Sequence, residues 1–104
     1  NKGMKILAIS AIGDTGGFIK TLKNAGFDVV DIMTFVDHYD YTQTDIEEAK
    51  KKIMKSTAEI AITTTKDAVK LSQLDLSGLD LYSIEAEFRL SPENEKNLMD
   101  IINA

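Results

Sequence analysis

The sequence contains no cysteine and only one histidine among its 104 residues. Without cysteine, the chain can form no disulfide, no thiolate nucleophile and no cysteine-ligated metal site, which fits a reducing compartment. A single histidine excludes a histidine-rich zinc site. No apolar run approaches the roughly 20 residues that a membrane-spanning helix needs. The first residues also lack the features of a secretory signal, because they lead directly into a strand-like segment.

Glycine is scarce too, and its six residues do not form a phosphate-binding loop. The pattern G-x-x-x-x-G-K-S/T occurs nowhere, so the chain cannot be a self-sufficient P-loop enzyme. Acidic residues outnumber basic ones by 17 to 12, and the formal net charge of −5 disfavours nucleic acid as a partner. A content of 43% hydrophobic and 28% charged residues is typical of one globular domain spanning residues 1–104.

Strand-like and helix-like patterns alternate along the chain. Short apolar runs predict strands over 5–10, 27–35, 60–64 and 79–88. Helices are predicted over 18–25, 44–54 and 66–71 and from Ser91 onward, and Gly26 is expected to end the first of them. This order predicts an α/β fold, with a four-stranded, mainly parallel open sheet and helices on both faces, like half of a Rossmann fold.

Two of the helix starts carry capping patterns. The segment Thr44-Asp45-Ile46-Glu47 has the form of a capping box, which predicts Thr44 as the cap of the second helix. The segment Ser91-Pro92-Glu93 combines a capping serine, a proline for the first helical position and an acid that suits the helix dipole. It predicts the start of the last helix.

In parallel sheets, ligands bind near the carboxyl ends of the strands, and three polar loops are expected there. The first holds Gly13, Asp14, Gly16 and Gly17. Backbone amides of such a loop can hold an anion at a helix start. The spacing differs from the dinucleotide pattern G-x-G-x-x-G, however, and Asp14 would repel a phosphate. An ordinary strand-to-helix turn therefore explains this loop better.

The second loop, Asp37-His38-Tyr39-Asp40-Tyr41, contains the histidine between acids and tyrosines. A neighbouring carboxylate can orient an imidazole for proton transfer, but a surface turn that caps the next helix accounts for the loop equally well. The third loop and its helix span 63–70. Its hydroxyls and Lys66 could orient a phosphate, although a helix cap with Lys66 paired to an acid is the simpler account.

Two catalytic classes are excluded by what these loops lack. A phosphoacceptor domain of the response-regulator type needs an acid at the end of the third strand, where this chain has threonines. A Ser-His-Asp hydrolase needs a nucleophile elbow, and no G-x-S-x-G pattern is present.

The three loops together, in this order, resemble the carboxyl-terminal half of the tetraacyldisaccharide 4′-kinase family, which acts in lipid A biosynthesis in Gram-negative bacteria. The family's Gly-Ile-Gly-x-Pro-x-x-Phe, Asp-His and Thr-Glu-Lys-Asp-Ala-Val-Lys motifs correspond to 11–18, 37–41 and 64–70. The resemblance runs from about Ile6 to Leu71. This chain has Ala11, Thr15 and Thr65 where the family has glycine, proline and glutamate.

The resemblance implies an enzyme that transfers the γ-phosphate of ATP, with Mg²⁺, to the 4′-hydroxyl of tetraacyldisaccharide 1-phosphate. It implies that the P-loop, the metal ligands and a catalytic aspartate belong to a missing amino-terminal domain. The fragment itself would then hold no cofactor or metal and would be inactive alone. The whole enzyme would be cytoplasmic, at the cytoplasmic face of the inner membrane.

Carried over by position, the resemblance implies roles for five residues. His38 would assist the catalytic aspartate and Asp37 would orient His38. Gly13, Lys66 and Asp67 would contact the substrate or the domain junction. Two alternatives remain open from the residues alone: a module that binds an anionic small molecule through the Gly13–Gly17 loop, and an interaction domain that docks another protein.

Overall fold

The structure, a computed structural model, describes residues 3–11 and 15–84 and the backbone of 90–92. The described strands are β1 (Lys5–Ser10), β2 (Asp28–Thr34), β3 (Ile60–Thr64), β4 (Leu81–Ile84) and β5 (Leu90–Pro92). The helices are α1 (Thr15–Asn24), α2 (Gln43–Lys55) and α3 (Thr65–Leu71). None of these helices is long and apolar enough to cross a membrane.

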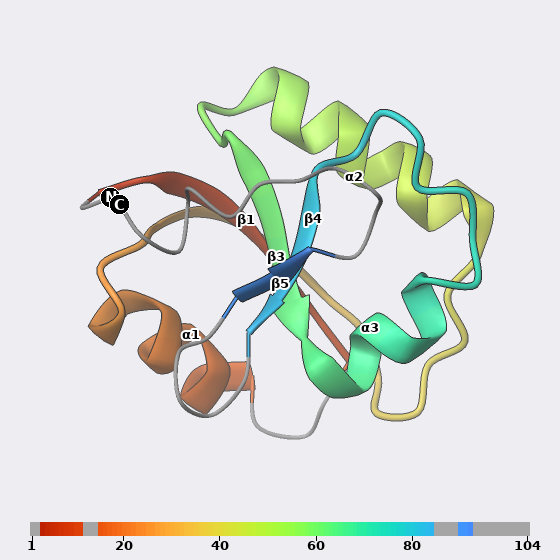
Figure 1. Ribbon diagram of the computed structural model, residues 1–104, viewed down its shortest axis with the longest axis horizontal. Coiled ribbons are helices and arrows are strands. Elements are labelled where there is room, and N and C mark those ends of the chain that lie inside the picture. Colours follow the sequence, from red (N-terminus) through yellow and green to blue (C-terminus); the bar gives the residue numbers. More distant parts are fainter. Residues whose placement is uncertain (1–2, 12–14, 85–89, 93–104) are drawn as a thin grey trace.

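The strands form one sheet in the order β2-β1-β3-β4-β5. The first four strands are parallel, and β5 pairs with β4 in the antiparallel direction. The chain moves from β1 to one edge and then back past β1 to β3, which places α1 on one face of the sheet and α2 and α3 on the other (Figure 1). The predicted α/β fold, with a mainly parallel open sheet covered on both faces, is confirmed.

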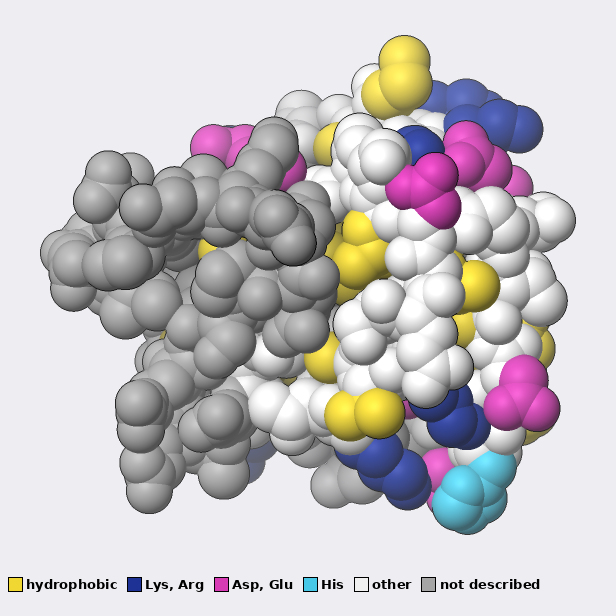
Figure 2. All heavy atoms as spheres, turned by 45° about the vertical axis from the view of Figure 1, so that its right-hand side comes forward, with side chains coloured by type: hydrophobic (Ala, Val, Ile, Leu, Met, Phe, Trp, Pro, Cys, Tyr) yellow, Lys and Arg dark blue, Asp and Glu magenta, His cyan; other side chains and the backbone are white. Residues whose placement is uncertain are grey.

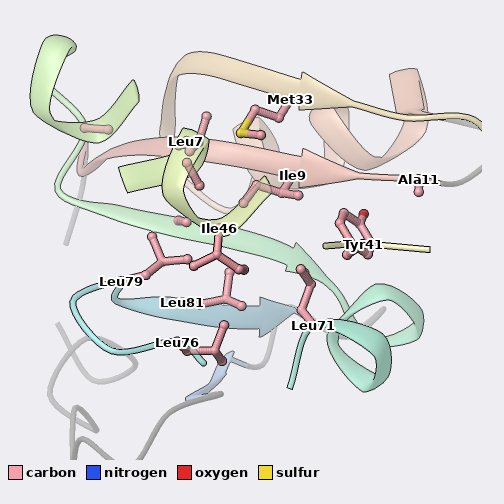
Figure 3. Packing of buried hydrophobic residues seen from close by; sticks show 13 residues of the cluster. Leu7, Ile9, Ala11, Met33, Tyr41, Ile46, Leu71, Leu76, Leu79 and Leu81 are labelled. Carbon is pink, nitrogen blue, oxygen red and sulfur yellow. The ribbon is translucent and has the colours of Figure 1, made fainter. Parts of the chain in front are cut away.

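The core has two parts because β1 is buried on both faces of the sheet. Ile6 and Ala8 of β1 pack with Phe18 and Leu22 of α1. The alternate residues Leu7 and Ile9 face the other way, into the cluster under α2 and α3 shown in Figure 3. Apolar residues in an unbroken run are what a central parallel strand needs.

The first helix ends as its sequence predicts. Gly26 adopts φ +97°, a left-handed conformation that suits glycine. Its amide donates to the carbonyl of Lys23 (3.0 Å), and the amide of Phe27 donates to the carbonyl of Leu22 (3.1 Å). These two bonds form a Schellman motif, which satisfies carbonyls that the helix end leaves free.

The capping prediction for α2 is wrong by two residues. The cap is Thr42, whose hydroxyl accepts from the amide of Asp45 while the Asp45 carboxylate accepts from the amide of Thr42. Thr44 lies inside the first turn of the helix. Both threonines have an acid three positions later, and Asp45 is fixed at Thr42 by a second contact, from the Tyr39 hydroxyl (2.8 Å).

The predicted start of the last helix is also wrong. Ser91 and Pro92 lie in β5, where they pair with Ser83 and Tyr82 of β4. Because β5 is an edge strand, a proline without an amide hydrogen is tolerated there, and non-local pairing prevails over the local capping pattern. The fourth parallel strand is described only as far as Ile84. Residues 85–89 and 93–104, which hold the rest of the two predicted elements, lie outside the described residues.

Candidate functional site

The described residues that directly follow β1, β2 and β3 lie at the carboxyl edge of the sheet. Ala11, after β1, is bonded to Asp67 of α3, and Asp37, after β2, is paired with Lys66 of α3. Four of the five residues singled out in the sequence therefore lie here. The fifth, Gly13, is outside the described residues. The only histidine lies at the surface with acidic and basic side chains near it (Figure 2).

Asp37 lies between His38 and Lys66. One carboxylate oxygen, Oδ2, is 3.7 Å from Nε2 of His38, and the other, Oδ1, is 3.6 Å from Nζ of Lys66. The His38 side chain is 77% exposed. The carboxylate thus lies near one ring nitrogen while most of the imidazole remains accessible from outside the domain.

The backbone of His38 has a conformation that the sequence did not predict. Its φ is +65°, and among the described residues it is the only non-glycine residue with a positive φ. The amide of Tyr39 donates to the carbonyl of Val36 (3.1 Å), so His38 occupies the third position of a tight turn. Glycine or asparagine is usual where such a position requires a positive φ. A side chain there indicates a conformation that the surrounding contacts hold in place.

Asp67 is a buried link between β1 and α3. Asp67 is only 3% exposed. Its Oδ2 accepts hydrogen bonds from the amide of Ala11 (3.0 Å) and from the hydroxyl of Thr64 (2.8 Å). The Asp67 amide donates in return to the Thr64 hydroxyl (3.0 Å), which caps the helix. The structure therefore places Asp67 inside the domain and Lys66 on its surface.

Three aromatic rings support the loop that carries His38. Phe35 and Tyr39 stack with ring centroids 4.4 Å apart, and Tyr41 packs edge-on against both at 5.2 Å. Tyr41 is buried near the end of β1, between Ala11 and Leu71 (Figure 3). Burial, followed by the charge of Asp67, raises the pKa of Tyr41, and the hydrogen bond to Asp45 raises the pKa of Tyr39.

Sequence reasoning missed Lys70 as part of this site. Its Nζ donates to the backbone carbonyl of Tyr39 (3.0 Å) and lies 3.6 Å from Oδ1 of Asp40. Its spacing could have indicated this role, because Lys66 and Lys70 are four residues apart and share one face of a helix.

Comparison with known proteins gives a consistent result. The family model that matches the chain, described as tetraacyldisaccharide-1-P 4′-kinase, covers residues 1–103. The tetraacyldisaccharide 4′-kinase of Desulfatibacillum aliphaticivorans is 39% identical over 84 residues, which make up 81% of this chain and 23% of that protein. The same-named protein of Aquifex aeolicus is 35% identical over 101 residues, 97% of this chain and 27% of that protein.

A third protein of the same name, from Halothermothrix orenii, is 30% identical over 107 residues, which make up 98% of this chain and 27% of that protein. The chain therefore spans about a quarter of the length of the curated relatives that it matches. No solved structure matches the chain.

Proposed function

The chain belongs to the tetraacyldisaccharide 4′-kinase family, and we propose that it is the carboxyl-terminal domain of such a kinase. The whole enzyme would transfer the γ-phosphate of ATP to the 4′-hydroxyl of tetraacyldisaccharide 1-phosphate, a step of lipid A biosynthesis. Two facts support this assignment: the similarity covers almost the whole chain but only a quarter of each relative, and the sequence has no P-loop. The missing P-loop domain would be the main partner.

We infer that ATP and Mg²⁺ would bind to the amino-terminal domain, because this chain has no P-loop. No three histidine, aspartate or glutamate side chains of the described residues gather into a set that could ligate a metal ion. We expect the 104-residue chain alone to be inactive.

The observation that carries the proposal is the exposed Asp37–His38 pair at the carboxyl edge of the sheet. Phosphoryl transfer depends mainly on positioning and electrostatic stabilisation, so a domain that closes on the site can contribute without holding the nucleotide. His38 would assist the aspartate base of the partner domain at the 4′-hydroxyl, and Asp37 would orient its ring. The whole enzyme would act on its lipid substrate at the cytoplasmic face of the inner membrane.

Replacement of His38 in the full-length kinase tests this role. We expect His38→Ala to lower kcat by about tenfold or more, because general acid–base assistance typically contributes at least that much. The melting temperature should change little, since the side chain is largely exposed. Lys51→Ala, on the exposed side of α2, is the matched control and should keep full activity. Unchanged turnover in His38→Ala would remove His38 from the mechanism.

A further inference from the structure

The left-handed backbone of His38 needs support from its neighbours. An L-residue with a Cβ atom is disfavoured at φ +65°, and such a conformation persists when contacts on either side determine it. The two residues that flank His38, Asp37 and Tyr39, both contact α3.

Tyr39 is fixed on three sides. Its carbonyl accepts from Nζ of Lys70 (3.0 Å), its ring stacks on Phe35 and its hydroxyl donates to Asp45 (2.8 Å). Asp45 in turn completes the capping box of α2 with Thr42. The charged amine of Lys70 bonds the peptide group between Tyr39 and Asp40, and the amide of Tyr39, in the peptide that follows His38, donates to the carbonyl of Val36. The Lys70 bond therefore restrains the backbone at the end of the turn, one peptide beyond His38.

Asp37, on the other side of His38, is held by Lys66. Nζ of Lys66 lies 3.6 Å from Oδ1 of Asp37, while Oδ2 faces His38. Because Lys66 and Lys70 are one helical turn apart on α3, a single helix reaches both flanks of His38. The start of α3 is itself anchored to the end of β1 through the buried Asp67.

We propose that Lys66 and Lys70 are positioning residues: Lys66 holds the Asp37 carboxylate before His38 and Lys70 holds the backbone at Tyr39 after it, so that the imidazole faces the partner domain. This inference rests on the function proposed above for His38. Both lysines and Asp37 are partly exposed and Asp40 is almost fully exposed. Ion pairs of that kind contribute little to stability. The effect of the lysines should therefore appear in the geometry of His38 and in catalysis, not in the melting temperature.

Nuclear magnetic resonance on the 104-residue chain tests the backbone and ring geometry of His38. The chain has one histidine, so its ring signals need no further assignment. A strong intraresidue NOE between the amide and Hα protons of His38 reports a positive φ. We expect Lys70→Met to weaken that NOE, Lys70→Arg to retain it, and Lys51→Met on α2 to leave it unchanged. Lys66→Met should change the ring resonances of His38 more than its backbone NOE, because Lys66 contacts the carboxylate and not the peptide. Circular dichroism confirms that each variant is folded.

Kinetics of the full-length kinase complete the test. We expect Lys70→Met to lower kcat by about ten- to a hundredfold with an unchanged KM, as misplacement of a catalytic group does, and Lys70→Arg to restore most of the rate. An unchanged NOE in Lys70→Met would overturn the proposal. The proposal would also be overturned if Lys70→Met lost the NOE but kept full kcat, while His38→Ala lowered kcat. Full activity of His38→Ala is a separate result, and it would reject the proposed function instead.

Discussion

At the scale of single residues, Asp67 is the link on which the candidate site depends. Its carboxylate is buried and accepts hydrogen bonds from the Ala11 amide and the Thr64 hydroxyl. Asp67→Ala leaves both donors without this acceptor in the interior. Since each bond to a charged acceptor contributes about 1.5–3 kcal/mol, we expect the free energy of unfolding to fall by about 3 kcal/mol in urea denaturation.

Two further variants separate this effect from a general loss of charge. Asp67→Asn keeps one acceptor oxygen and should recover about half of the lost stability. Asp28→Ala, at the exposed start of β2, removes a carboxylate from the surface and should change stability by less than about 0.5 kcal/mol. Similar losses in Asp67→Ala and Asp28→Ala would show that burial of Asp67 does not stabilise the junction of β1 and α3.

At the scale of elements, the sequence determined the sheet and the meeting of the three loops. The apolar runs at 5–10 and 60–64 predicted strands of a mainly parallel sheet. Parallel strands bring their carboxyl ends to one edge, which is why Asp37 and Lys66 could be expected together. The left-handed His38 and the β5 pairing were not predictable. Both depend on contacts between residues far apart in sequence, such as Lys70 with Tyr39.

The cap of α2 tests whether contacts in the folded structure decide between two local capping patterns. Thr42 and Thr44 both fit a capping pattern, but only Thr42 makes the reciprocal bonds with Asp45. We expect Thr42→Ala to lower the free energy of unfolding by about 1 kcal/mol, the usual cost of a lost cap. Thr44→Ala, in the exposed first turn, should have almost no effect. Urea denaturation of the two variants side by side decides between the two caps, and a larger loss for Thr44→Ala would contradict the structure.

At the scale of the whole molecule, the domain buries two of its tyrosines. Its three tyrosines are Tyr39, Tyr41 and Tyr82, and the last two are buried. Burial, together with the charge of Asp80, raises the pKa of Tyr82 to about 12, and burial raises the pKa of Tyr41 as well. The fold therefore opposes ionisation of these phenols, and its stability should depend on pH in the alkaline range.

The sign follows from linkage. Below about pH 10, where an unfolded tyrosine begins to ionise, Tyr82 is neutral in both states and its contribution to stability is constant. Above that pH the unfolded state loses its protons first, so the free energy of unfolding should fall until the folded phenol ionises near pH 12. For Tyr82 the loss should be on the order of 2 kcal/mol. Urea denaturation at a series of pH values, with tyrosinate absorbance as a second signal, measures it.

Tyr82→Phe is the decisive variant for this prediction. The hydroxyl of Tyr82 is buried, and the described residues provide it with no hydrogen bond, so phenylalanine should fit the same space at little cost near neutral pH. Without a phenol at position 82, the variant should lose less stability than the wild type between about pH 10 and pH 12. Lysine deprotonation affects both proteins alike, so the difference isolates Tyr82. Identical alkaline profiles would show that ionisation of this buried ring does not limit the stability of the domain.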